Sequence, residues 1–329
     1  MAIVGSKLNK LNNIYLEKWF VLIIIFFKIC LIPVYAKLRV NLPEQYTQMK
    51  DGEKLRYEFL SGEVKKPVII LIHGQNEHYG MYNEFTKSAR TAGFDILRFD
   101  MVGQGKSTGR RCYIPSYNQY DSHLEQLISQ LKERGHTKIH IVAHSTGSFI
   151  ALYYLASRKN KETNVNRVVV SAPFLGLGGG FVNKHLAGNV AQFLTKIDFL
   201  SRSRVPEVRN YQFTNNGLTH DPKIFREIYT PQAKEFALKC GSPTWNWLAE
   251  ISKAQKTFKG LGHRIKNPLM IIKAGKDTVV DNDLIDEFYS TVKDNNEKNK
   301  IITMKDNYHS NYMELNRFES YKLTLEYLR

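Results

Sequence analysis

Short apolar runs of strand length alternate with helical segments along most of this chain, and this alternation restricts the fold more than any other feature. The runs PVIILIH, FDILRFD, KIHIVAHS, RVVVSAP, PLMIIKAG and KIITMK lie at residues 67–73, 94–100, 138–145, 167–173, 268–275 and 300–305. Apolar strands that alternate with helices are typical of a parallel sheet covered on both faces. The sequence therefore predicts an α/β fold with a doubly wound, mostly parallel sheet, whose sites lie at the carboxyl ends of the strands.

The alternation of strands and helices stops between residues 176 and 260. This stretch has no clear strand pattern but contains amphipathic helical segments, among them FVNKHLAGNVAQFL at 181–194 and WNWLAEISKAQKTF at 245–258. Helical periodicity of this kind directs one apolar stripe toward a core. We expect a helical cap at 176–260, inserted between two parts of the sheet domain at 37–175 and 261–329.

The N-terminal residues 1–36 predict a signal peptide or a membrane anchor. Three lysines precede the apolar run WFVLIIIFFKICLIPVYA at 19–36, and small or β-branched side chains before Lys37 suit cleavage after Ala36. Lys28 interrupts the run and would cost roughly 2.5–3.5 kcal/mol near mid-bilayer, which weakens the spanning alternative. A buried N-terminal helix is the third alternative. We expect a membrane-associated or exported protein, and the side of the membrane stays open.

Charge and cysteine usage limit the partners. The chain of 329 residues has 47 basic and 31 acidic residues and a formal net charge of +16. Such a surface suits nucleic acid, anionic membranes or phosphate-bearing small molecules. The basic residues are scattered and no nucleic-acid-binding motif is present, so we expect no nucleic acid partner. Of the 3 cysteines, Cys30 lies in the apolar run, while Cys112 and Cys240 could form one disulfide that the sequence does not establish.

Two motifs resemble ligand sites but fail on spacing or context. The segment GQGKST at 103–108 looks like the end of a phosphate-binding loop, but Asp100 stands where that loop needs glycine. His136, His140 and His144 would share one face of a helix, but their segment reads as a strand, which spreads residues by about 3.3 Å each. We expect neither a nucleotide site nor a metal site from these residues.

The segment AHSTG at 143–147 joins an apolar strand to a helical pattern, with Ser145 at the turn. This arrangement resembles a nucleophile elbow, whose usual pattern is Gly-x-Ser-x-Gly. The residues two before and two after the nucleophile must be small. Gly147 meets this condition, and Ala143 adds only a methyl group. The alternative is a serine that caps the following helix.

Two residues later in the chain favour the nucleophile. An acyl-transfer serine needs a histidine base oriented by a carboxylate, and in this sheet order the acid follows the serine and the histidine comes last. Asp277 follows the run PLMIIKAG, and His309 follows KIITMK. Asp281 is the alternative acid, farther from its strand. We expect a catalytic triad of Ser145, Asp277 and His309.

An oxyanion hole needs two N–H donors placed beside the nucleophile. The residue after the nucleophile supplies one donor in this architecture, and here it is Thr146. The loop after the strand at 67–73 supplies the other, and its segment HGQNEHYG places Gln75 directly after Gly74. We therefore expect the backbone N–H groups of Gln75 and Thr146 to bind the oxyanion.

Together these motifs resemble a known family. HGQNEHYG, FDMVGQGKSTG, VAHSTGS, AGKDTVVD and YHSNYME occur in the order and spacing of α/β-hydrolase serine lipases, and look most like the monoglyceride lipase and bacterial lysophospholipase branch of the serine aminopeptidase-like hydrolases. The cap segments NNGLTHDPKIFREIY and CGSPTWNWLAEI are similar to those of bacterial membrane-associated lysophospholipases. The resemblance covers about residues 50–329. The Ala143 departure leaves the triad intact.

The resemblance implies an α/β-hydrolase fold and an acyl-enzyme mechanism on Ser145. It implies a lysophospholipid or monoacylglycerol substrate, action at a membrane surface, and no metal or organic cofactor. The cap would provide an apolar groove for the acyl chain.

Other functions stay open at this point. One is a monoacylglycerol lipase or a general carboxylesterase, because no residue reads a phosphate unambiguously. Another is an aminopeptidase, which would need acidic cap residues for a free amine. Candidates are Asp221, Glu227, Glu235 and Glu250. A catalytically silent binding protein is the third, and the oligomeric state is unknown.

Overall fold

A computed structural model describes residues 45–62, 66–158, 163–178, 184–206 and 212–329. The predicted signal peptide or anchor lies outside these residues. The described residues from Gln45 to Arg329 form one compact unit. Among its described helices, none combines the length and the apolarity that crossing a bilayer would require.

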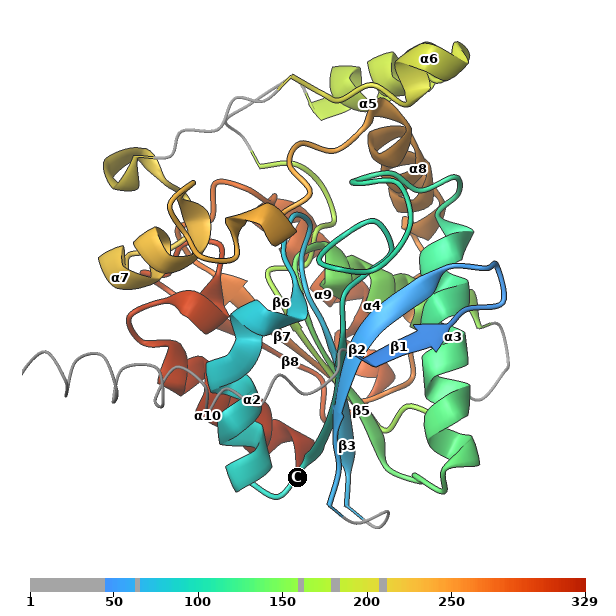
Figure 1. The fold of residues 1–329 in the computed structure, drawn as a ribbon. Coiled ribbons are helices and arrows are strands. Elements are labelled where there is room, and N and C mark those ends of the chain that lie inside the picture. Colours follow the sequence, from blue (N-terminus) through green and yellow to red (C-terminus); the bar gives the residue numbers. More distant parts are fainter. Residues whose placement is uncertain (1–44, 63–65, 159–162, 179–183, 207–211) are drawn as a thin grey trace, which may run out of the picture. The chain divides into compact units, whose positions relative to one another are not determined.

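Eight strands form one sheet in the order β1-β2-β4-β3-β5-β6-β7-β8 (Figure 1). The strands are β1 Gln45–Gln48, β2 Lys54–Leu60, β3 Val68–Ile72, β4 Asp95–Phe99, β5 Ile139–His144, β6 Arg167–Ser171, β7 Leu269–Ala274 and β8 Lys300–Met304. β2 pairs antiparallel with both β1 and β4, whereas β3 to β8 run parallel to one another. The predicted doubly wound, mostly parallel sheet is confirmed.

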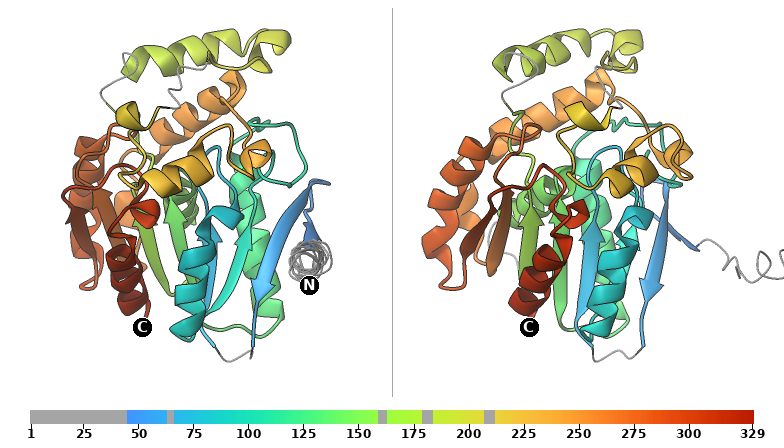
Figure 2. Two further views of the ribbon diagram at one scale, coloured as in Figure 1. Left: turned by 60° about the vertical axis from the view of Figure 1, so that its left-hand side comes forward. Right: turned by 90° about the vertical axis from the view of Figure 1, so that its left-hand side faces the viewer.

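Helices cover both faces of this sheet because its strands are apolar on both sides. The helices are α2 Asn83–Thr91, α3 Asn118–Glu133, α4 Thr146–Ser157, α5 Lys184–Leu194, α6 Asp198–Ser201, α7 Pro222–Ile224, α8 Trp245–Phe258, α9 Asn282–Val292 and α10 Arg317–Leu328. Short helical turns are η1 Tyr79–Tyr82, η2 Phe213–Asn215, η3 Phe225–Tyr229, η4 Phe236–Leu238, η5 Gly262–Arg264, η6 Lys293–Asn295 and η7 Asn311–Met313. α2 and α10 lie together on one face (Figure 2), and α3, α4 and α9 contribute to the core on the other.

β3 shows how its side chains serve the two cores. Ile69 and Leu71 belong to the core under α2 and α10, whereas Val68, Ile70 and Ile72 belong to the core under α3, α4 and α9. Successive side chains of a strand point to opposite faces of the sheet. The sequence of a strand that is buried on both faces is therefore one continuous apolar run.

The segment between β6 and β7 contains α5 to α8, and α5 and α6 lie beyond the carboxyl ends of the strands (Figure 1). α8 coincides with the predicted helix at 245–258, and it packs against α5. Trp247 of α8 stacks on Phe174, with 6.3 Å between the ring centroids. This contact anchors α8 to the chain that leaves β6.

Candidate active site

Ser145 occupies a strained turn between β5 and α4. Its backbone angles are φ 52° and ψ −118°, in a region that residues other than glycine rarely adopt. The N–H of Ser145 donates to Ser171 O at 2.9 Å, which ties the turn to β6. The side chain makes no capping hydrogen bond to α4. The helix-cap alternative therefore does not account for this serine, and the strained backbone is typical of a functional site.

The two small residues that flank the elbow differ in how much space they have. A Cβ atom on Gly147 would lie 2.5 Å from the carbonyl oxygens of both Ile72 and His73, so only glycine fits there. Ala143 is buried in β5 and pairs with Ile72 and Val170. Its methyl group is accommodated by the sheet. The turn therefore needs the second glycine of the pattern and tolerates alanine in place of the first.

The structure brings Ser145, His309 and Asp277 together at the carboxyl ends of β5, β8 and β7. His309 Nδ1 lies 2.7 Å from Asp277 Oδ2, and His309 Nε2 lies 3.0 Å from Ser145 Oγ. When Nδ1–H donates to Asp277, Nε2 can accept the hydroxyl proton of Ser145. This is the hydrogen-bond chain that an acyl-transfer nucleophile requires.

Asp277 is held ionised by its surroundings. Its side chain is fully buried, and Oδ1 accepts the N–H groups of Val279 and Val280 at 2.8 and 3.0 Å. Burial raises the pKa of this carboxyl, but the contact with His309 and the two N–H donors outweigh burial and keep the pKa below its usual value. Asp277 can therefore orient His309 as a carboxylate.

Asp281, the alternative acid, has a different role. It is the N-cap residue of α9, where its Oδ1 accepts the N–H of Asp283 at 3.0 Å. His309 contacts Asp277 instead. The geometry thus favours Asp277 over Asp281 as the residue that orients His309.

Gln75 and Thr146 both lie beside Ser145. Gln75 follows Gly74, and a Cβ atom on Gly74 would lie 3.1 Å from Ser145 Cβ, so this loop passes directly against the nucleophile. Within the described part of the chain, the backbone N–H of neither Gln75 nor Thr146 donates a hydrogen bond. Unpaired N–H donors next to a nucleophile can bind an oxyanion.

Sequence reasoning missed a buried carboxylate behind this loop. Glu77 Oε2 accepts the N–H of Gly74 and the hydroxyl of Tyr82, each at 2.7 Å. Burial raises the pKa of Glu77, but the neighbouring His144 ring and then the hydrogen bonds from Tyr82 and Gly74 lower it, and the net pKa lies below the usual value. The position of an acidic residue directly after HGQN was the only sequence signal for this support.

His144 lies between Glu77 and the triad. Its ring centroid is 4.7 Å from that of His309. Burial lowers the pKa of His144 to about 4, although the carboxylate of Glu77 opposes this shift. His144 is therefore neutral at neutral pH and places no positive charge beside His309. Among the described residues, no group of histidine, cysteine, aspartate or glutamate side chains has an arrangement that could hold a metal ion.

Cys112 and Cys240 form a disulfide. They are separated by 128 residues in the sequence, and their Cα atoms are 5.5 Å apart. Cys112 lies in the loop that follows β4, and Cys240 lies between η4 and α8. The bond therefore links the loop after β4 to the segment between β6 and β7.

Comparisons with known proteins identify the family of this chain. The family profile described as "Serine aminopeptidase, S33" (Hydrolase_4) matches residues 63–316, which include the whole triad. The chain belongs to this family. The resemblance noted in the sequence is thereby confirmed, together with the α/β-hydrolase fold.

Several relatives of this S33-family chain have names that describe ester hydrolysis. This chain is 26% identical over 291 residues to the probable lysophospholipase L2 of Haemophilus influenzae, and the match covers 83% of this chain and 90% of the relative. It is 24% identical to phospholipase YtpA of Bacillus subtilis, covering 70% and 83%. A soluble variant of the monoglyceride lipase from Saccharomyces cerevisiae shares the fold with a TM-score of 0.69, 20% identity and coverage of 88% and 96%. The S33-family chain is a carboxylic ester hydrolase.

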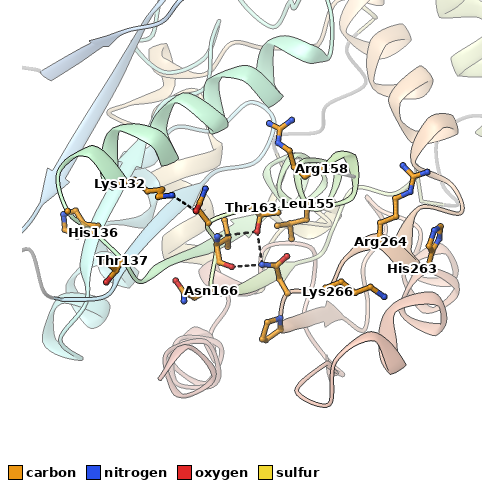
Figure 3. A pocket seen from close by; sticks show the side chains of 15 residues that line it. Lys132, His136, Thr137, Leu155, Arg158, Thr163, Asn166, His263, Arg264 and Lys266 are labelled. Carbon is orange, nitrogen blue, oxygen red and sulfur yellow. Dashed lines mark hydrogen bonds between the residues drawn. The ribbon is translucent and has the colours of Figure 1, made fainter. Parts of the chain in front are cut away.

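A basic cleft of about 970 Å³ lies at the amino ends of β5, β6 and β7. Figure 3 shows the side chains that line it. Its lining contains none of the triad residues. Lys132 donates to Asn164 Oδ1 at 2.6 Å, and Arg158 pairs with Asp121 and Glu125 behind the cleft. The charge of Arg158 is therefore neutralised within the protein, and the triad residues lie at the other end of the strands.

Proposed function

We propose that this chain is a lysophospholipase that cleaves the carboxylic ester of lysophospholipids through an acyl-enzyme on Ser145. The observation that supports this most directly is the hydrogen-bond chain from Ser145 through His309 to Asp277, next to two unpaired N–H donors. The names of the bacterial relatives add the lipid substrate class.

The reaction follows from the placement of these groups. His309 Nε2 takes the hydroxyl proton of Ser145 while Ser145 Oγ attacks the ester carbonyl. The N–H groups of Gln75 and Thr146 hold the oxyanion of the tetrahedral intermediate. The intermediate collapses, the C–O bond to the alcohol breaks, and His309 gives its proton to the leaving oxygen. Water, deprotonated by His309, then hydrolyses the acyl-enzyme and releases the fatty acid.

A parallel turnover assay tests the substrate class. We expect kcat/KM to be highest for lysophosphatidylcholine, lower for monoolein, and at background for an amino-acid arylamide. The triad can act on any ester carbonyl. The difference in kcat/KM between lysophosphatidylcholine and monoolein therefore reports the preference for a head group. A preference for monoolein would replace the proposal with a monoacylglycerol lipase. A preference for the arylamide would refute the lipid substrate.

The family description raises an aminopeptidase as the second candidate, and contacts in the structure count against it. Three of the acidic candidates for an amine site already have partners. Asp221 caps α7 and pairs with Arg317, Glu250 accepts the N–H of Tyr117, and Glu235 lies 3.5 Å from His78. Glu227 lies in η3. These contacts favour structural roles for three of the four residues.

The outer surface of α5 and α6 suits contact with a lipid bilayer. Phe193, Ile197 and Phe199 are 66%, 53% and 79% exposed, and Val190 is also exposed. These large exposed apolar side chains lie within ten residues of one another in the chain, and exposed apolar patches mark interaction sites. α5 and α6 lie beyond the carboxyl ends of the strands (Figure 1), and the triad residues follow the carboxyl ends of β5, β7 and β8. We propose that this surface binds the membrane that supplies the substrate, aided by the basic net charge.

Changing Phe193 and Phe199 together to serine is expected to weaken co-sedimentation with phosphatidylglycerol-containing vesicles by about tenfold or more, because each buried phenylalanine contributes roughly 1.5–3 kcal/mol. Turnover of a soluble short-chain ester should stay unchanged. The matched control is Phe318→Ser on α10, another exposed phenylalanine. Equal loss of vesicle binding in the control, or no loss in the double variant, would contradict this surface.

We also propose that the protein is exported or held at a membrane with its catalytic domain in an oxidising compartment. The disulfide supports this location, because such bonds persist mainly outside the reducing cytosol. The predicted signal peptide or anchor at 1–36 agrees with it. N-terminal sequencing of membrane and soluble fractions distinguishes a retained anchor from cleavage after Ala36.

A further inference from the structure

The side chain of Gln75 rests on the disulfide. Its Nε2 donates to Cys112 Sγ at 3.3 Å and lies 3.6 Å from Cys240 Sγ. On its other side, Gln75 Oε1 accepts a hydrogen bond from Gln104 Nε2 at 2.9 Å. The residue with the proposed oxyanion N–H thus has its side chain fixed between the two sulfur atoms and the loop after β4.

The next residue, Asn76, is held by the same two segments. Its N–H donates to Gln104 Oε1 at 2.6 Å, and its Oδ1 accepts the N–H of Gly241 at 2.7 Å. Asn76 has a φ of 61°, which an L-residue rarely adopts. Asparagine adopts this region more readily than most residues, and the two hydrogen bonds hold Asn76 in it. One of these restraints comes from Gly241, the direct neighbour of Cys240.

The disulfide is the covalent part of this arrangement. Cys112 and Cys240 are only 1% and 4% exposed. Around the bond, the N–H and the hydroxyl of Thr244 both donate to Cys112 O, at 3.0 and 3.1 Å. Without the S–S bond, the segment at 240–241 would be joined to the loop after β4 by hydrogen bonds alone. Water can compete for such bonds.

The loop at residues 74–77, which carries the N–H of Gln75, is called the oxyanion loop below. We propose that the Cys112–Cys240 disulfide positions this loop, acting through Gln75 and Asn76, so that opening the bond reversibly lowers kcat. This inference rests on the proposed function of Ser145. The oxyanion donors act mainly in the transition state, and a small displacement of one of them reduces kcat more than substrate binding. The disulfide is therefore a positioning element rather than a part of the reacting groups.

Reduction is a balanced two-electron step. Dithiothreitol supplies two electrons and two protons, the S–S bond breaks to give two cysteine thiols, and the reagent becomes its cyclic disulfide. Removing the reagent in the presence of an oxidant such as oxidised glutathione re-forms the protein disulfide. A bond that only stabilised the folded state would change the unfolding midpoint and leave kcat of the folded enzyme unaltered.

The test uses the full chain and a 4-nitrophenyl fatty-acid ester, whose turnover does not depend on a head group. Opening of the bond is followed by thiol labelling with mass mapping, and folding by circular dichroism. We expect reduction to lower kcat by about tenfold to a hundredfold, below the 10²–10³ for complete loss of a donor. KM should change by less than about threefold, and reoxidation should restore kcat.

Two variants identify the route of the effect. Gln75→Leu keeps the backbone N–H but loses the side-chain contacts with the sulfurs and Gln104. With its disulfide intact, it should lose kcat and keep KM, and reduction should then lower kcat by a smaller factor than in the wild type, because the two changes act on one loop. The double variant Cys112→Ser/Cys240→Ser should have a low kcat that dithiothreitol does not alter, which excludes effects through Cys30.

Each outcome decides the proposal. Reduced, folded wild-type enzyme with unchanged kcat would overturn it, as would independent losses from reduction and from Gln75→Leu. If reduction unfolds the protein, the disulfide-intact Gln75→Leu variant decides: an unchanged kcat overturns the proposal and a lowered kcat with unchanged KM supports it. If the oxidised wild type hydrolyses no ester at all, the proposed function fails, and this inference fails with it.

Discussion

Replacing Ser145 by alanine should reduce kcat for ester hydrolysis by about 10⁵–10⁶-fold and abolish covalent labelling by a fluorophosphonate probe. The reason is geometric. Ser145 Oγ is the atom that His309 Nε2 contacts at 3.0 Å, and the removal of this oxygen leaves no group in the elbow to form the acyl-enzyme. The residual rate would come from binding and the oxyanion donors alone.

Ser148→Ala is the matched control for this experiment. Ser148 lies in α4, is fully buried, and donates its hydroxyl to Ser171 O at 3.0 Å. Its hydroxyl bonds to Ser171, whereas His309 bonds to Asp277 and Ser145, so the Ser148→Ala variant should label and turn over like the wild type. Labelling of the Ser145→Ala chain at the wild-type rate would show that Ser145 is not the nucleophile. The argument from Ser145 against a catalytically silent binding protein would then fail as well.

Asp277→Asn has the second largest expected effect, a loss of about 10⁴-fold in kcat with the protein still folded. An asparagine side chain can present an amide N–H to His309 Nδ1 and so favour the tautomer whose proton sits on Nε2. That nitrogen then cannot accept the hydroxyl proton of Ser145. The fall should appear in kcat more than in KM, because the fully buried Asp277 side chain acts through His309.

Asp281→Asn serves as its control, since it makes the same chemical change four residues away. Asparagine caps helices about as well as aspartate, so α9 should keep its N-terminus and the enzyme should keep its rate. Equal losses in the two variants, or a larger loss at Asp281, would show that the acid has been assigned to the wrong residue.

The parallel part of the sheet was predictable from sequence, whereas its antiparallel edge was not. β3 to β7 are buried strands, and burial on both faces leaves continuous apolar runs that stand out in a sequence. β8 is the parallel edge of the sheet and only partly buried, but it keeps Ile301, Ile302 and Met304, so its run was still visible. β1, with the sequence QYTQ, is mostly exposed, and most of β2 is only partly buried. Edge strands of this kind need few apolar residues, so their pattern does not differ from that of a loop.

The candidate site was likewise only partly predictable from the sequence. Ser145, Asp277 and His309 were predictable because each follows a recognisable strand, and strand ends meet at one edge of a parallel sheet. The pairing of Cys112 with Cys240 depends on contacts across 128 residues of sequence. The support from Glu77 was equally hidden, since a buried carboxylate looks like any surface acid until its partners Gly74 and Tyr82 are known.

The pairing of β6 with β7 has a consequence for how such an enzyme can diversify. Everything between Ser171 and Leu269 leaves the sheet at one strand and returns at its immediate neighbour. The ends of this insertion are already close together, and doubling the length of a flexible loop costs only about 0.6 kcal/mol. Evolution or an engineer can therefore exchange the whole insertion for another while the nucleophile, acid and base keep their scaffold. In this chain, the bond at Cys240 is the point that a replacement would have to preserve or rebuild.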